Sequence, residues 1–269
     1  MNAIKIDVEL RKIRRERSRW ISNRRSCLVV VAGVKLEAMK EATYKDFFIT
    51  ALGHDGFRVE NDSLKLSFAF DPYDIVGEHK PVDFVFVSHP HFDHCDISSI
   101  RKLLGPKSRV IAPQCCADEL QPFADQLDLF VGPDKVVSNK LTYWAIPAYN
   151  IDKFRTPTEV FHPRELGGIG FVVEIPINGS KNIRFYHAGD TDLVPEMEEV
   201  KKIDVAFLPI SGTFVMTLEE ALKAAELIEA DLTIPMHYGK LLGSTAEAQR
   251  FANLLKEKLS VAVLSTESL

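Results

Sequence analysis

The chain has 269 residues, of which 46% are hydrophobic and 26% are charged, a composition typical of globular proteins. This length suits one large α/β domain or two small domains. The formal net charge of −5 argues against a general nucleic-acid-binding protein. Because the sequence has no run of about 18 or more apolar residues, no membrane span is predicted.

The N-terminal part of the sequence differs from the rest. Residues 1–25 contain nine basic and three acidic residues, and a short apolar run over 27–34 follows them. This order suggests a signal peptide, but the apolar run is short and no A-x-A-like cleavage site follows it. We therefore predict a basic extension over residues 1–45, either packed on the domain or partly upstream of the true start, since Met39 is an in-frame methionine. The main domain is expected over residues 46–269.

From residue 47 onward, apolar and alternating segments predict a run of strands that later alternates with helices. Strands are predicted at 47–52, 57–60, 64–70, 82–87, 109–112, 127–131, 143–146, 170–175, 183–187, 205–210, 232–235 and 261–264. Helices are predicted at 97–104, 114–124, 218–230 and 246–259. This order favours an α+β fold, with two sheets packed together and helices outside, over one doubly wound sheet.

The cysteines indicate a reducing compartment, so a cytoplasmic location is expected. The sequence has four of them, and the adjacent pair Cys115 and Cys116 does not resemble a disulfide framework. Cys95 lies inside the histidine-rich motif described next. It is expected to be a small buried side chain beside the site, with a metal ligand as the alternative.

Residues 88–96 read S-H-P-H-F-D-H-C-D and follow the apolar segment 82–87. His89, His91, Asp93 and His94 therefore come directly after a strand that is expected to be buried on both faces. Imidazole and carboxylate groups are the ligands that zinc, iron and manganese take in proteins. Four such groups at this density predict a metal site, and bound metal could generate hydroxide at neutral pH.

Two further clusters follow predicted strands. The first reads H-A-G-D-T-D over residues 187–192, where the Asp190 carboxylate could bridge two metals. The second reads I-P-M-H-Y-G over 234–239 and places His237 just past a short apolar strand. Either cluster alone is a common structural turn, but both occur in a chain that also has the H-x-H-x-D-H run, so metal ligation is the favoured interpretation.

These motifs resemble those of the metallo-β-lactamase-fold hydrolases over about residues 47–269. The segments G-H-D-G-F, F-D-P-Y, S-H-P-H-F-D-H, H-A-G-D-T-D and I-P-M-H-Y-G are most similar to the branch that includes L-ascorbate-6-phosphate lactonase and N-acyl-phosphatidylethanolamine-hydrolysing phospholipase D. The resemblance implies an αββα sandwich, with two mixed sheets packed face to face and helices outside. It also implies a dinuclear metal site in the cleft between the sheets.

The resemblance assigns roles to individual residues. His89 and His91 would bind the first metal, and Asp190 would bridge both metals. The ligands implied for the second metal are Asp93, His94 and His237. Asp71 would not bind metal itself but would hold a metal-binding loop in position, because hydrogen bonds to ligand imidazoles fix their orientation. The candidate catalytic side chains are Asp93, which could orient the nucleophile and move a proton, and His54, which lies near the cleft without an assigned role.

One departure from the family's pattern concerns the first metal. The family usually supplies another histidine after the strand that corresponds to 143–146, whereas this chain reads P-A-Y-N over 147–150. His162 could replace that histidine from the far end of a long loop. The alternatives are that Asn150 serves as a weak substitute, or that the first metal is under-coordinated.

The predicted function is hydrolysis of an ester, lactone or phosphodiester by a metal-bound hydroxide. The expected cofactors are two divalent ions, zinc foremost, with manganese or iron as alternatives. Lys153, Arg155 and Arg164 in the loop 150–168 could receive an anionic small-molecule substrate, and a homo-oligomer is compatible with the sequence. The alternatives are a ribonuclease of the same fold, with salt-dependent RNA affinity as its signature, and a non-hydrolytic metal-binding or redox protein.

Overall fold

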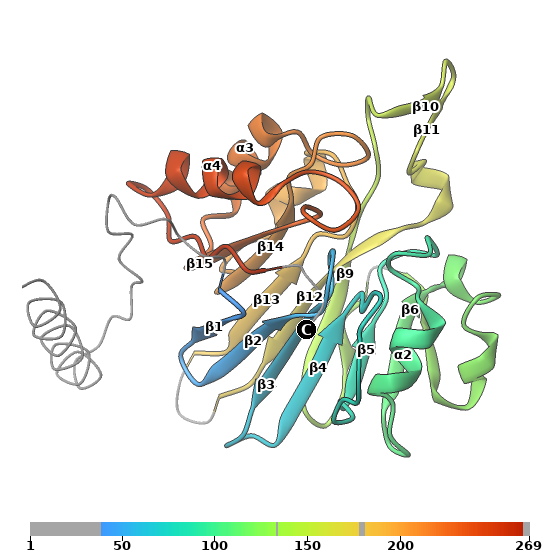
Figure 1. Cartoon of the computed structure of the whole chain (residues 1–269). Coiled ribbons are helices and arrows are strands. Elements are labelled where there is room, and N and C mark those ends of the chain that lie inside the picture. The colour runs from blue at the N-terminus through green and yellow to red at the C-terminus, as the bar shows by residue number, and fades with distance from the viewer. Residues whose placement is uncertain (1–38, 133, 178–180, 266–269) are drawn as a thin grey trace, which may run out of the picture. The chain divides into compact units, whose positions relative to one another are not determined.

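The computed structural model describes residues 39–132, 134–177 and 181–265 (Figure 1). The predictions made for residues 1–38 lie outside these described residues. Within them, two sheets face each other and carry helices on their outer surfaces, and this confirms the predicted αββα sandwich.

The first sheet has seven strands in sequence order, from β1 to β7. The strands from β1 to β4 pair antiparallel as a meander, and those from β4 to β7 pair in parallel. Their bounds are β1 Glu41–Tyr44, β2 Phe47–Ala51, β3 Phe57–Asn61, β4 Leu66–Phe70, β5 Phe84–Phe86, β6 Arg109–Pro113 and β7 Leu127–Phe130. Strand β5 is buried along its whole length, as its uninterrupted apolar sequence predicts.

The second sheet has six strands in the order β15-β14-β13-β12-β9-β8. The strands β13, β14 and β15 pair in parallel, so their carboxyl ends meet at one edge of the sheet. The bounds are β8 Val136–Val137, β9 Thr142–Pro147, β12 Ile169–Ile175, β13 Ile183–His187, β14 Val205–Pro209 and β15 Leu232–Met236. A separate hairpin of β10 Phe154–Thr156 and β11 Glu159–Val160 lies in the loop between β9 and β12.

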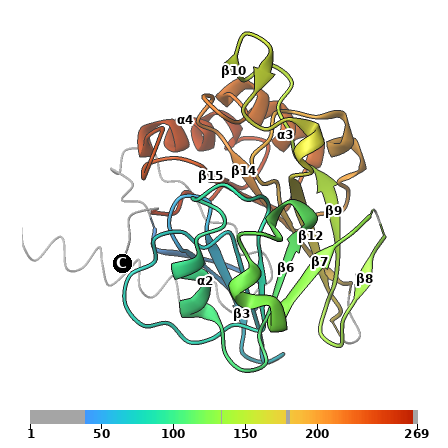
Figure 2. The ribbon, with the colours of Figure 1, turned by 90° about the vertical axis from the view of Figure 1, so that its right-hand side faces the viewer.

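Three described α-helices cover the outer faces of the sheets (Figure 2). Helix α2 (Ile97–Leu103) packs on the first sheet, while α3 (Leu218–Ile228) and α4 (Thr245–Leu255) pack on the second. Each begins at a residue whose side-chain oxygen accepts a backbone N–H two or three residues on: Asp96, Thr217 and Ser244 respectively. These N-caps satisfy amide groups that would otherwise lack partners at the helix starts.

The core between the sheets is rich in phenylalanine. Phe68 and Phe185 come from opposite sheets and meet with ring centroids 5.6 Å apart, and Phe86 and Phe171 meet in the same way at 5.1 Å. Such pairs bury large apolar areas, and the Phe68–Phe185 pair has the favourable edge-to-face geometry. This packing holds the strand ends of both sheets at a fixed separation.

Some predicted elements differ from the structure. The predicted helix over 114–124 is instead two short 3₁₀ helices, Gln114–Cys116 and Gln121–Gln126, because Pro122 cannot continue a helix and begins the second segment. The predicted strand over 261–264 is reduced to isolated bridges at Val261 and Leu264. Strand β1 lies inside the segment predicted as the extension, so the sheet begins earlier than residue 46.

Candidate metal centre

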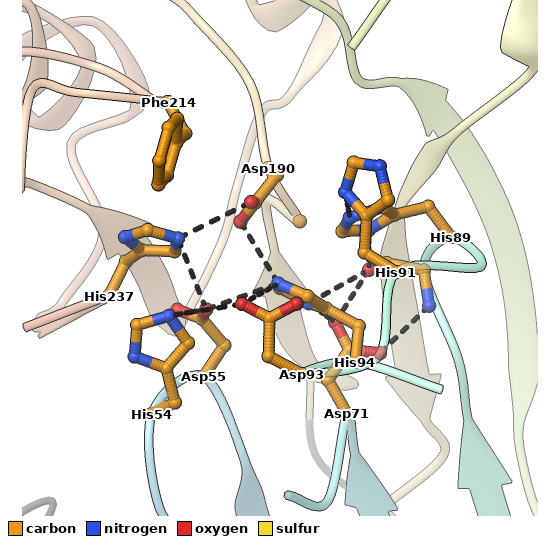
Figure 3. A network of polar contacts seen from close by, with 12 residues as sticks. His54, Asp55, Asp71, His89, His91, Asp93, His94, Asp190, Phe214 and His237 are labelled. Carbon is orange, nitrogen blue, oxygen red and sulfur yellow. Dashed lines mark hydrogen bonds and ion pairs between the residues drawn. The ribbon is translucent and has the colours of Figure 1, made fainter. Parts of the chain in front are cut away.

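The site forms where five loops meet at the strand ends of the two sheets, and the long loop between β9 and β12 contributes His162. The turn between β2 and β3 contributes residues 54 and 55, and the loop after β5 contributes 89–94. The loops after β13 and β15 contribute Asp190 and His237. Figure 3 shows Asp190 pointing toward His94 and His237, with Asp55 and Asp93 on the opposite side of the same space. Carboxyl ends of parallel strands often gather functional loops in this way.

Three histidines form the first ligand group. His91 Nδ1 lies 3.0 Å from His89 Nε2 and 3.0 Å from His162 Nε2. Burial lowers the pKa of His91, lowers that of His89 well below its ordinary value, and lowers that of His162 to about 4. The three rings are therefore neutral near pH 7, which is the state in which imidazole binds a metal.

The ring nitrogens that face away from this group are held by hydrogen bonds. Ser88 Oγ donates its single proton to Asp71 at 2.6 Å, so it accepts from His89 Nδ1 at 2.9 Å. Asn150 Nδ2 donates to Asp192 and to Phe214 O, so Asn150 Oδ1 accepts from His162 Nδ1 at 2.9 Å. Both contacts leave the Nε2 atoms unprotonated and facing the site.

The structure thus places His162 and Asn150 differently. His162 joins His89 and His91, whereas Asn150 lies behind His162 as a hydrogen-bond acceptor. Of the alternatives that the sequence left open for the first ion, this arrangement favours His162 as the ligand and Asn150 as its support.

The second ligand group contains Asp55, His94, Asp190 and His237, all of them buried. His94 Nε2 lies 3.3 Å from Asp190 Oδ1, and His237 Nε2 lies 3.3 Å from Asp190 Oδ2. Asp71 Oδ2 accepts from His94 Nδ1 at 2.8 Å, and Ser211 Oγ is hydrogen-bonded to His237 Nδ1 at 2.6 Å.

The electrostatics of the second group favour a cation. Burial lowers the pKa of His237, but the negative charges of Asp190 and Asp55, together with the hydrogen bond to Asp190, outweigh burial and raise that pKa to about 9. Burial raises the pKa of Asp190, but the charges of His237 and His94 hold it well below its ordinary value. Asp190 Oδ2 also lies 3.3 Å from His162 Nε2, so this carboxylate touches both ligand groups and is placed to bridge them.

The buried polar atoms of this centre fit divalent cations. Seven buried side-chain atoms of the described residues lack an aligned hydrogen-bond partner, and six of them lie here. They belong to four residues: both ring nitrogens of His54, both oxygens of Asp55, His94 Nε2 and Asp190 Oδ1. Leaving such groups unsatisfied is unfavourable, and metal ions would satisfy the carboxylates and bare imidazoles together.

Asp93 and His54 lie beside the second group and, with His237, form a further set whose ligand atoms lie within 4.8 Å of one another, so the role of Asp93 as a ligand of the second ion stays a prediction. Asp93 Oδ2 is 3.5 Å from His54 Nε2 and 4.0 Å from His94 Nε2, and 14% of its side chain is exposed. Burial, with the charges of His237 and His94, lowers the pKa of His54 to about 2, so its ring is neutral. Asp93 is thus the carboxylate of this centre with the most access to solvent.

Sequence reasoning missed Asp55 and His187 as parts of the site. Asp55 lies in the G-H-D-G-F segment and was given no role, although an acidic residue next to His54 at a strand end repeats the pattern of the other clusters. His187 is fully buried and stacks on Phe70 at 4.9 Å, and its Nε2 donates to the backbone oxygen of Asp55 at 2.9 Å. No sequence pattern signalled this contact.

The three loop cations predicted to receive an anionic substrate each have a carboxylate partner. Lys153 pairs with a group of acids that includes Asp192 at 3.2 Å and Glu220 at 2.9 Å. Arg155 pairs with Glu159 at 2.7 Å, and Arg164 with Glu196 at 2.6 Å. The Lys153 ammonium therefore already contacts all three of the acids Asp152, Asp192 and Glu220, which could otherwise face a metal ion. Cys95 is buried in the apolar cluster under α2.

Two facing sheets with a centre of histidines and aspartates at their strand ends define the metallo-β-lactamase class of proteins. Residues 59–238 match the Beta-lactamase superfamily domain. The chain belongs to this family and is a metal-dependent hydrolase of the metallo-β-lactamase superfamily.

Its relatives agree with this assignment. The chain is 31% identical over 230 residues to a UPF0173 metal-dependent hydrolase of Pyrococcus furiosus, covering 80% of this chain and 95% of that protein. It is 31% identical over 214 residues to one from Nanoarchaeum equitans, covering 78% and 92%. The narrower resemblance to the lactonase and phospholipase branch stays a prediction.

Solved structures show the same fold. A crystal structure described as a metal-dependent hydrolase of Parabacteroides distasonis superposes with a TM-score of 0.70 at 25% identity, covering 85% of this chain and all of that one. Igni18, a metallo hydrolase of Ignicoccus hospitalis, has a TM-score of 0.64 at 21% identity, covering 82% and 96%, and shares the fold. None of the described helices has the length and apolar character that a membrane crossing requires.

Proposed function

We propose that this hydrolase uses a dinuclear centre to cleave carboxylic esters or lactones of small molecules. The observation that carries the proposal is that two groups of largely buried ligand residues both contact Asp190. The first group offers unprotonated imidazole nitrogens, and the second contains carboxylate and imidazole atoms without hydrogen bonds. The group of His89, His91 and His162 suits zinc, because neutral imidazole binds zinc well.

Two divalent ions, when bound, supply the positive charge that acidifies a water molecule and polarises the scissile carbonyl. Side chains of the protein would accept and donate the protons that move during hydrolysis. Asp93, whose side chain is 14% exposed, would orient the attacking water and accept its proton. The neutral His54 ring, 3.5 Å from Asp93 Oδ2, limits the positions that this carboxylate can take.

The surroundings of the centre favour a substrate with an apolar portion. Phe92 is 68% exposed and lies 5.8 Å from the Tyr73 ring on one side. On the other side, Phe214 lies 6.5 Å from the His237 ring and 4.5 Å from Phe161. These aromatic rings would contact an acyl or alkyl group next to the scissile bond.

A neutral scissile group is favoured over a phosphodiester. The loop cations that the sequence offered for an anion are all engaged by carboxylates of the same chain. An anionic group on the substrate would have to displace those partners. A phosphodiester is therefore the second candidate. No described feature favours the ribonuclease or redox alternatives: the first has its support in the basic residues of the N-terminal segment, and the second rests on the fold alone.

The test begins with elemental analysis of the purified protein, followed by reconstitution with zinc, manganese or iron. A panel of lactones, p-nitrophenyl esters and bis-p-nitrophenyl phosphate is then screened, with Asp190→Asn as the inactive control. Ester or lactone turnover that depends on metal supports the proposal. Turnover of the phosphodiester alone, or no hydrolysis by protein that holds two ions, contradicts it.

A further inference from the structure

We infer that Asp55 is a ligand of the second metal ion, so that two carboxylates and two imidazoles hold this ion. The inference rests on the dinuclear centre proposed above. It assigns a function to a residue of the β2–β3 turn, outside the H-x-H-x-D-H run and outside the roles that the family resemblance carries over.

The first argument is geometric. Asp55 Oδ2 lies 3.4 Å from His94 Nε2 and 3.9 Å from His237 Nε2. An ion with tetrahedral bonds of about 2.0–2.2 Å separates adjacent ligand atoms by roughly 3.3–3.6 Å. The contact from Asp55 to His94 falls in this range, as do the two contacts of Asp190 at 3.3 Å. Asp93 lies farther from His94, at 4.0 Å.

The second argument is that no hydrogen bond satisfies the Asp55 carboxylate, whose remaining contact in the centre is the neutral His54 ring, with Nε2 3.5 Å from Oδ2. Its side chain is fully buried, and neither carboxylate oxygen has a hydrogen bond. Structural aspartates in this chain are different: Asp71 accepts three hydrogen bonds, and Asp204 accepts from Tyr44, Arg184 and Lys45. A buried carboxylate without hydrogen bonds carries a large desolvation penalty, which a bound cation offsets.

The third argument is that the backbone around Asp55 is fixed. The turn is closed by hydrogen bonds from Gly56 N to Gly53 O at 2.6 Å and from Leu52 N to Gly56 O at 2.7 Å. Gly53 has φ +90°, and a Cβ there would lie 2.7 Å from a backbone oxygen of Tyr73. His187 then holds the Asp55 carbonyl from β13. Such support is typical of groups that must keep a set position.

A consequence concerns metal preference. The first ligand group offers three imidazoles, whereas the second, with Asp55, offers two carboxylates and two imidazoles. Carboxylate-rich sites suit manganese better than imidazole-rich sites do. We therefore expect the second site to discriminate less between zinc and manganese than the first. Asp93 is then left available for proton transfer.

The test is Asp55→Asn, which keeps the side-chain shape and removes the charge. Calorimetric titration with Zn²⁺ and with Mn²⁺, together with elemental analysis, measures both sites. The first ion should bind as in the wild type. The second should bind on the order of 100-fold more weakly, because even loss of a group that only orients a ligand lowers affinity by roughly 10–100-fold. The loss should be larger for Mn²⁺ than for Zn²⁺.

Thermal unfolding gives a readout that a structural role would not produce. Metal-free Asp55→Asn should melt at or above the wild-type temperature, because an unpartnered buried carboxylate is gone. Its metal-induced increase in melting temperature should be smaller. The matched control Asp204→Asn should melt lower in both states and keep both ions. Asp93→Asn should weaken the second ion less than Asp55→Asn does.

The outcomes separate this inference from the dinuclear proposal. Two ions bound to Asp55→Asn with wild-type affinities would overturn the inference, as would a metal-free variant that melts well below the wild type. A wild type that binds one ion would refute the dinuclear centre instead. In that case the role of Asp55 stands if Asp55→Asn weakens the single ion, and falls if the ion binds unchanged.

Discussion

Replacement of Asp71 with asparagine tests whether the second metal site depends on the hydrogen bond that orients the ligand His94. Asp71 is 1% exposed and accepts hydrogen bonds from Ser88 N at 2.8 Å, Ser88 Oγ at 2.6 Å and His94 Nδ1 at 2.8 Å. An asparagine amide has one oxygen and one NH₂ group, so the NH₂ group must face a donor. At least one of the three hydrogen bonds is then lost and a buried donor is left unsatisfied.

The expected magnitude follows from these contacts. An unsatisfied buried donor costs about 1–3 kcal/mol, and the remaining bonds lose the strength that a charged acceptor provides. The metal-free Asp71→Asn protein should therefore lose about 3 kcal/mol of unfolding free energy. For a chain of this size that corresponds to a melting temperature lower by roughly 6–12 °C. The freed His94 ring should lower the affinity of the second ion by roughly 10–100-fold.

Scanning calorimetry of metal-free protein measures the first effect, and calorimetric titration with Zn²⁺ measures the second. Asp62→Asn, on the exposed β3–β4 turn, is the control and should change neither quantity appreciably. If Asp71→Asn melts like the wild type and binds both ions unchanged, the reasoning is refuted. In that case the hydrogen bond from His94 to Asp71 would be needed neither for stability nor for binding of the second ion.

Asp190→Ala should lose both ions and all turnover, because its carboxylate contacts both ligand groups; full metal content by elemental analysis would contradict the bridging role. His162→Ala should lower the occupancy of one ion while the other stays bound, and Asn150→Ala should do less, as titration of both variants would show. A chain that begins at Met39 should fold and keep its metal, and insolubility would show that earlier residues belong to the core. Burial lowers the His237 pKa, but the charges of Asp190 and Asp55 together outweigh burial and raise that pKa to about 9 in the metal-free protein, so a proton must leave before metal binds. Apparent affinity should therefore rise with pH up to about 9, and a flat profile from pH 7 to 9 would count against this.

Local sequence determined most of the secondary structure. Strand β5 was predicted from an uninterrupted apolar run, and β13 was predicted with its observed bounds. The prediction of secondary structure failed where the apolar pattern of a segment does not match the conformation that the segment adopts. The segment 114–124 is apolar enough for a helix, but Pro122, at the start of the second 3₁₀ helix, cannot continue a helix that begins at residue 114. The hairpin of β10 and β11 was not predicted because its residues are mostly exposed and carry no apolar alternation.

The sequence by itself also determined which chemical groups the centre can use. Histidines and aspartates after strands can face one cleft once the strands align, and the H-x-H-x-D-H spacing predicted a metal site without knowledge of the fold. The tertiary structure alone decided which groups share a site. Asp55 meets His94 and Asp190 only because strand pairing and sheet packing bring the turn after β2 beside the loops after β5 and β13. His162 reaches His91 only because Asn150 and the loop after β9 hold it there. Such contacts join residues far apart in the chain, and local patterns carry no information about them.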